Sequence, residues 1–153
     1  MRTSLLTTFV VVIALLDSGA RGAELNGTAT IKGRCTKLIL ADQVVRGCQG
    51  ILLNTSYADG RSGFYFVSGD TIVTFTGAGS RQIMQGPDKV AQPIDQVITS
   101  IKGKPRQAKA VGSCRFGNPY KGAVTIECRA DTQQGRYEGD FTTDGLPPNV
   151  TKF

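Results

Sequence analysis

The stretch that decides the fold is VTIECRAD, residues 124–131, in which apolar and polar side chains alternate without a break. One face of the stretch is apolar and consists of Val124, Ile126, Cys128 and Ala130. A period of two residues is typical of a β-strand that packs one face on a core and exposes the other to water. The stretch therefore predicts a half-buried strand.

The same alternation continues on both sides of this strand and is interrupted by turn sequences such as DTQQG at 131–135. It predicts about nine strands joined by short links. They lie at residues 28–40, 43–57, 62–67, 71–76, 80–85, 90–101, 106–116, 122–131 and 135–142. Short links place consecutive strands side by side and antiparallel. We expect an all-β fold, a small antiparallel meander barrel, with a two-sheet β-sandwich as the alternative. The barrel is favoured because closure removes exposed strand edges.

Residues 90–101 also fit a helix, because their apolar side chains recur close to the spacing of a helical face. Pro93 interrupts the first turn of such a helix, and the apolar residues are β-branched. The following KGKP sequence at 102–105 is typical of a hairpin tip. We therefore expect a strand at this place.

The first 20 residues have the plan of a secretory signal peptide. Arg2 precedes an apolar run at residues 5–16, which is shorter than the roughly 20 residues that span a bilayer. Ser18 and Ala20 are small residues at the two positions that a signal peptidase reads. Cleavage is therefore expected after Ala20, which makes residues 1–20 the signal peptide.

Without this signal the chain is expected to hold one β domain at 21–145 and a loose C-terminal tail at 146–153. Arg2 and Asp17 are removed together, so the net charge stays at +6. We expect an exported protein, periplasmic or secreted, that has no membrane span after signal removal.

Four cysteines in an exported chain predict two disulfide bonds. If Cys114 lies opposite Cys128 in a hairpin, the register joins two apolar residues on one face and opposite charges on the other. These pairs are Phe116 with Ile126 and Arg115 with Glu127. The pairing leaves Cys35 for Cys48.

The second hairpin is less favourable, because it sets Lys37 opposite Arg46. A bond from Cys35 to Cys128, which would staple the barrel closed, is therefore the alternative. No Cys-x-x-Cys spacing is present, so we expect neither a redox pair nor a thiolate metal site.

The chain contains no His, which excludes Ser-His and Cys-His nucleophiles, a His base and a His-ligated zinc ion. Glu138, Asp140 and Asp144 lie close together in the sequence and leave a carboxylate-based hydrolase as an alternative. Glu138 and Asp140 fall on the strand face expected to be in water. We expect no enzyme activity, no catalytic residue, no cofactor and no metal.

Cations gather in two places. One group surrounds the predicted hairpin tip and consists of Lys102, Lys104, Arg106 and Lys109, and the second consists of Lys32, Arg34, Lys37 and Arg46. Such groups can hold an anionic polymer or lipid head groups. The simpler interpretation is that they keep strands soluble and protect edges. Nucleic acid is not expected, because the chain is exported and has only 7% aromatic residues.

Small side chains dominate one predicted inner face, formed by Ala108, Ala110, Gly112, Cys114 and Phe116. They leave room for a ligand in a barrel mouth, or they allow strands to coil tightly, which is the preferred interpretation. Asn26, Asn54 and Asn149 each begin an Asn-x-Ser/Thr sequence, which accepts a glycan in a eukaryotic secretory pathway.

These patterns predict a small exported, disulfide-containing β-barrel that binds a ligand or a protein partner in the cell envelope or outside the cell. The alternatives are a basic envelope protein that docks on anionic polymers or lipid head groups, and the carboxylate-based hydrolase.

Overall fold

The computed structural model describes residues 23–153, so the predicted signal peptide lies outside the described residues. The described chain forms eleven strands and one short 3-10 helix. The elements are β1 (Leu25–Leu40), β2 (Gln43–Val44), β3 (Ile51–Tyr57), β4 (Arg61–Ser68), β5 (Thr71–Ala78), η1 (Gly79–Arg81), β6 (Ile83–Gly86), β7 (Lys89–Ile101), β8 (Lys104–Gly117), β9 (Thr125–Thr132), β10 (Gly135–Thr143) and β11 (Asn149–Lys152).

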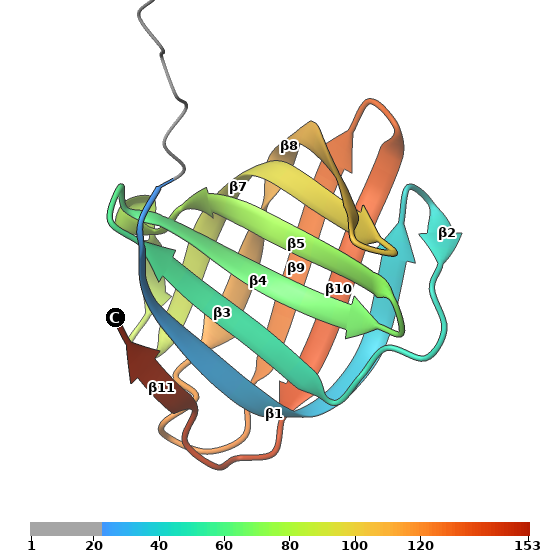
Figure 1. The fold of residues 1–153 in the computed structure, drawn as a ribbon. Helices are drawn as coiled ribbons and strands as arrows, with labels where there is room; N and C mark the ends of the chain where they lie inside the picture. Colours follow the sequence, from blue (N-terminus) through green and yellow to red (C-terminus); the bar gives the residue numbers. More distant parts are fainter. Residues whose placement is uncertain (1–22) are drawn as a thin grey trace, which may run out of the picture.

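Eight strands follow one another as antiparallel neighbours and close on themselves, because β10 pairs with β1 (Figure 1). The remaining strands extend the wall: β2 and β11 pair with β1, and β6 pairs with β7. The predicted meander barrel is confirmed, and the β-sandwich alternative is wrong. Residues 89–101 form β7, as a strand between β5 and β8, so the helical alternative is wrong too.

The long strand β1 has different neighbours along its length. Its first half, from Leu25 to Lys32, pairs with β3, whereas Gly33 and the residues after it pair with β10. The register shifts between Cys35 and Lys37, which forms a bulge. The change of neighbour begins at Gly33, before the bulge, and Figure 1 shows β1 passing from β3 to β10.

The strand predicted at 43–57 is wrong, because an irregular segment at residues 45–50 separates β2 from β3. Gly47 has a φ of 76°, a left-handed conformation that interrupts a strand. The Gln49 amide donates to the Val67 carbonyl oxygen at 2.7 Å, so β4 holds this segment through a contact between residues distant in sequence.

Two other segments differ from the prediction. The strand expected at 80–85 begins as η1 and becomes a strand only at β6. The segment 146–153, expected to be a loose tail, contains β11, which pairs with β1 (Figure 1). All four residues of β11 are exposed, so backbone pairing alone forms the strand and no apolar period marks it.

Apolar side chains fill the barrel interior. The rings of Phe66 and Phe75 lie 5.6 Å apart and both are buried, as is Phe141. The disulfide between Cys114 and Cys128 stands in the same core with both residues 0% exposed. Among residues 23–153, no helix is long and apolar enough to cross a membrane.

The disulfide bonds pair Cys114 with Cys128 and Cys35 with Cys48, so the alternative bond from Cys35 to Cys128 is wrong. The predicted hairpin register is confirmed for both flanking pairs, Phe116 with Ile126 and Arg115 with Glu127. Arg115 and Glu127 form no ion pair within 4.0 Å, although they lie opposite each other.

The predicted opposition of Lys37 and Arg46 is wrong. Segment 45–50 leaves β1 after the amide of Val45 has bonded to the Leu38 carbonyl oxygen. Lys37 instead lies opposite Asp140 of β10. The Cys35–Cys48 bond therefore ties an irregular segment to β1 and creates no like-charge pair.

The small inner face of β8 is explained by close approach of two strands. A methyl group on Gly112 would overlap the carbonyl oxygen of Arg129 in β9. Ala110 and Cys114 on the same face are buried. These small residues therefore allow tight coiling, in agreement with the preferred interpretation.

Candidate ligand site at the barrel mouth

One end of the barrel, here called the mouth, is where β1 begins and β8 ends. A cavity of about 210 Å³ opens there. Its inner wall is apolar, and the rings of Phe64 and Phe116 lie 5.4 Å apart within it. The full lining is Ala29, Ile31, Asn54, Phe64, Gln82, Phe116, Gly117, Pro119, Tyr120, Ile126 and Pro148. This cavity is called the mouth pocket below.

Strand alternation builds the inner wall of the mouth pocket. Ala29 pairs with Asn54 across β1 and β3, and Asn54 pairs with Phe64 across β3 and β4. On the other side, Phe116 pairs with Ile126 across β8 and β9. Each of these side chains points inward because it lies an even number of residues from a core position of its own strand.

Asn54 brings a polar group into this apolar wall. Its Nδ2 donates to Ser62 Oγ at 3.1 Å and to the Gly63 carbonyl oxygen at 3.0 Å. Both amide hydrogens are therefore used, and the carbonyl oxygen Oδ1 is the atom available to a ligand.

Gln82 reaches the mouth pocket from the link between η1 and β6. Its Nε2 donates to Oε1 of Gln92 at 3.1 Å. Gln92 is fully buried on β7, and its own Nε2 donates to the Ser62 carbonyl oxygen at 3.4 Å. A buried amide anchored in this way holds the Gln82 side chain over the pocket.

The rim is formed by the link between β8 and β9, residues 118–124. Asn118 Oδ1 accepts a bond from the Tyr120 amide at 3.0 Å, which shapes the turn. Lys121 Nζ lies 2.9 Å from Asp88 Oδ1, so an ion pair connects this link to the β6–β7 hairpin. The hydrogen bond from Lys121 lowers the pKa of Asp88.

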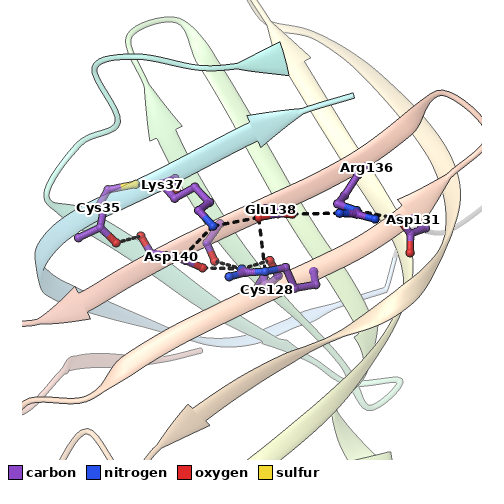
Figure 2. A network of polar contacts seen from close by, with 10 residues as sticks. Cys35, Lys37, Cys128, Asp131, Arg136, Glu138 and Asp140 are labelled. Atoms are coloured by element: carbon purple, nitrogen blue, oxygen red, sulfur yellow. Dashed lines mark hydrogen bonds and ion pairs between the residues drawn. The ribbon is translucent and has the colours of Figure 1, made fainter. Parts of the chain in front are cut away.

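The carboxylates considered for hydrolysis lie elsewhere. Figure 2 shows Glu138 and Asp140 on β10 within a network of charges on the outer surface of the barrel. Glu138 Oε2 lies 3.2 Å from Lys37 Nζ and 3.5 Å from Arg129 Nε. Asp140 also pairs with Arg129.

Arg129 is charged in this network. Burial opposes its charge, but the hydrogen bond with Asp140 and the charges of Asp140 and Glu138 raise its pKa overall. Asp144 forms none of the ion pairs found in residues 23–153. This arrangement joins strands and faces away from the mouth pocket.

The predicted basic residues are partly brought together at the opposite end of the barrel, here called the far end. Lys102 and Lys104 lie at the β7–β8 hairpin tip, and the Lys102 amide donates to the Asp70 carbonyl oxygen. Asp70 lies in the turn of the β4–β5 hairpin. Arg46 contacts the same hairpin, because its carbonyl oxygen accepts a hydrogen bond from Ser68 Oγ at 2.7 Å.

Other predicted cations lie apart from the far end. Lys109 lies farther along β8, and Lys37 belongs to the charge network shown in Figure 2. Lys32 and Arg34 are exposed near the middle of β1.

The three Asn-x-Ser/Thr sequences have different environments. Asn54 points into the mouth pocket and its amide is hydrogen-bonded, whereas Asn26 and Asn149 are exposed. Asn54 itself is half-buried, so among the three only Asn26 and Asn149 are exposed residues in the folded chain.

Sequence reasoning missed most of the mouth pocket. The alternation of Val90, Gln92 and Ile94 marks Gln92 as an inward polar residue, and this signal was present in the sequence. The meeting of Asn54, Phe116 and Pro148 has no local signal, because they come from β3, β8 and the link before β11.

Comparison of the chain with protein-family models, with curated proteins and with solved structures gives no significant match.

Proposed function

We propose that this chain is an exported, non-enzymatic protein that binds a small, largely apolar ligand in the mouth pocket. The signal-like leader and the two disulfide bonds support export. The absence of His and the ion-paired state of Glu138 and Asp140 support a role without catalysis.

The observation that carries the proposal is the composition of the mouth pocket. Aromatic and aliphatic side chains form its wall, and Asn54 and Gln82 supply a few fixed polar groups. This is the usual composition of ligand sites, and barrel mouths are frequent locations for them. An eight-stranded barrel is either filled by side chains or holds one small ligand, and in this chain the mouth pocket leaves free space at one end. A volume of about 210 Å³ suits a compact molecule.

A fluorescence titration with N-phenyl-1-naphthylamine, a neutral aromatic probe, tests the proposal. The mature chain should bind the probe with micromolar affinity. Ala29→Phe places a ring in the mouth pocket and should weaken binding by about tenfold or more, which corresponds to about 1.4 kcal/mol. Val111→Phe places the same ring at a position that is 81% exposed on β8 and serves as the matched control.

Circular dichroism and the thermal midpoint must show that both variants are folded. Absence of binding to the mature chain, or equal binding by Ala29→Phe and Val111→Phe, would overturn the proposal. Native mass spectrometry of protein purified from its own source would then identify the natural ligand.

A second candidate function is docking on an anionic polymer or lipid surface through the far end. The specific observation is that Arg46 and Lys102 contact the same β4–β5 hairpin although they are distant in sequence. Arg46, Lys102, Lys104 and Arg106 form no ion pair within residues 23–153. Their charge is therefore available to a polyanion.

Retention on heparin tests this second candidate. Combined replacement of Lys102, Lys104 and Arg106 by Ala should release the chain at lower salt. The matched control removes the same charge away from the far end by replacing Lys32, Arg34 and Lys152, which are exposed on β1 and β11. Equal effects of the two triple variants would mean that net charge, and not the far end, governs retention.

A further inference from the structure

A second cavity adjoins the mouth pocket. It has a volume of about 320 Å³ and shares Phe116 and Gly117 with the mouth pocket. Its remaining lining is Gln85, Lys89, Val90, Arg115, Val124, Thr125 and Glu127. The end of β8 therefore separates two cavities of different chemistry, and the second is called the basic cavity below.

Two cations line the basic cavity. Lys89 begins β7 and Arg115 lies near the end of β8, and neither forms an ion pair within residues 23–153. The nearby Lys121 differs, because its charge is matched by Asp88. Lys89 and Arg115 thus remain available to an anion.

One acid faces these cations. Glu127 lies opposite Arg115 in the hairpin register and also lines the basic cavity, but it forms no ion pair within the described residues. Lys89, Arg115 and Glu127 together leave the cavity with a surplus of one positive charge. The surplus matches a ligand group with a single negative charge.

We propose that the ligand is a small amphipathic anion, with its apolar body in the mouth pocket and its single oxyanion group in the basic cavity. This inference rests on the proposed function of the mouth pocket. Phe116 and Gly117 line both cavities, so a ligand that contacts the Phe116 ring reaches the cations by passing over the end of β8. Gln85 adds a side-chain amide that can donate to the oxyanion.

A pair of probes separates the two parts of the proposal. N-phenyl-1-naphthylamine and 8-anilino-1-naphthalenesulfonate have the same ring system, and only the second carries a sulfonate. The mature chain should bind the sulfonate about tenfold more tightly at low salt, since two exposed ion pairs contribute up to about 1 kcal/mol each. The difference should shrink at high salt.

Variants of the cations locate the sulfonate. Combined Lys89→Ala and Arg115→Ala should remove the advantage of the sulfonate and leave binding of the neutral probe unchanged. The matched control, Lys104→Ala with Lys109→Ala, removes two exposed cations of β8 that line neither cavity and should preserve the advantage.

Glu127→Gln provides a test in the opposite direction. Removing this carboxylate should tighten binding of the sulfonate several-fold and leave the neutral probe unaffected. Partial unfolding also increases binding of this sulfonate probe, so the thermal midpoint of the variant must equal that of the native chain. A gain at an unchanged midpoint then reports on charge in the basic cavity.

The outcomes distinguish the two proposals. If neither probe binds, the proposed function of the mouth pocket fails. If the neutral probe binds but the sulfonate has no advantage, or if the advantage survives in the Lys89 and Arg115 variant, the mouth pocket stands and the amphipathic anion is rejected.

Discussion

The Nζ atom of Lys37 lies 3.2 Å from Oε2 of Glu138, although the two residues are 101 positions apart in the sequence. The contact crosses the seam between β1 and β10 at which the barrel closes (Figure 2). Lys37 Nζ also lies 3.6 Å from Asp140 Oδ2, so it contacts two carboxylates of the same strand, which Arg129 contacts as well.

Replacing Lys37 by Met should lower the free energy of unfolding by about 1 kcal/mol, because Glu138 and Asp140 then lose a shared cation. The two carboxylate side chains are only 12% and 15% exposed, so solvent replaces that cation poorly. Urea unfolding at low and high salt measures the loss, which should be smaller at high salt. Lys109→Met is the control, and an equal loss in that variant would contradict the role of the seam.

Gly112→Ala should destabilise the barrel by roughly 3 kcal/mol or more, because the added methyl group overlaps the backbone of β9. Gly86→Ala on β6 is the matched control, since the nearest atom to its methyl group would be 3.9 Å away. Thermal midpoints of both variants check this prediction. Similar midpoints would mean that β8 and β9 can separate without loss of stability.

The two disulfide bonds should differ in their accessibility to reductant. Cys114 and Cys128 are 0% exposed, whereas Cys35 and Cys48 are half-buried at the edge of the core. A mild reductant under native conditions should therefore open the Cys35–Cys48 bond first. Alkylation followed by peptide mass mapping identifies the reduced pair. Earlier labelling of Cys114 would show that the core opens more readily than segment 45–50.

The Arg61–Asp95 ion pair should make a pH-dependent contribution to stability. Arg61 donates to both carboxylate oxygens of Asp95, and this hydrogen bonding lowers the pKa of Asp95. A lowered carboxyl pKa stabilises the fold above the ordinary carboxyl range, and the gain is lost as the pH falls from about 4 through the lowered value.

Asp95→Asn should thus be less stable than the native chain at pH 7 and equal to it in strong acid. The difference at pH 7 should stay below about 1 kcal/mol, because the side chains of Arg61 and Asp95 are 32% and 60% exposed. Urea unfolding across this pH range measures the difference. In an Arg61→Gln background the Asp95→Asn change should have no effect, and a persistent effect there would assign it to another contact.

Sequence patterns predicted the features of this fold that depend on neighbouring strands. Alternation around Cys114 and Cys128 was sufficient for the register of β8 and β9 and for one disulfide bond. The break at Gly47 was not predictable in the same way, because the bond from Gln49 to Val67 joins residues of different hairpins.

The mouth pocket was less predictable still. Alternation predicts which residues of β3, β4 and β8 point inward. It does not predict which strand pairs with β1 at the seam. β1 begins to pair with β10 at Gly33, where the two backbones lie too close together for a side chain. A glycine in a strand can mark a close approach of another backbone, but it does not show which distant strand that backbone belongs to.

The dual pairing of β1 has a consequence for the order in which the protein is made. The first strand to be synthesised acquires its neighbour across the seam only when β10, among the last strands, becomes available. Contacts between such distant parts of a chain form slowly, since a long loop must be closed first. The barrel of the newly made polypeptide therefore stays open until β10 has been translated, a property that would suit the export proposed above.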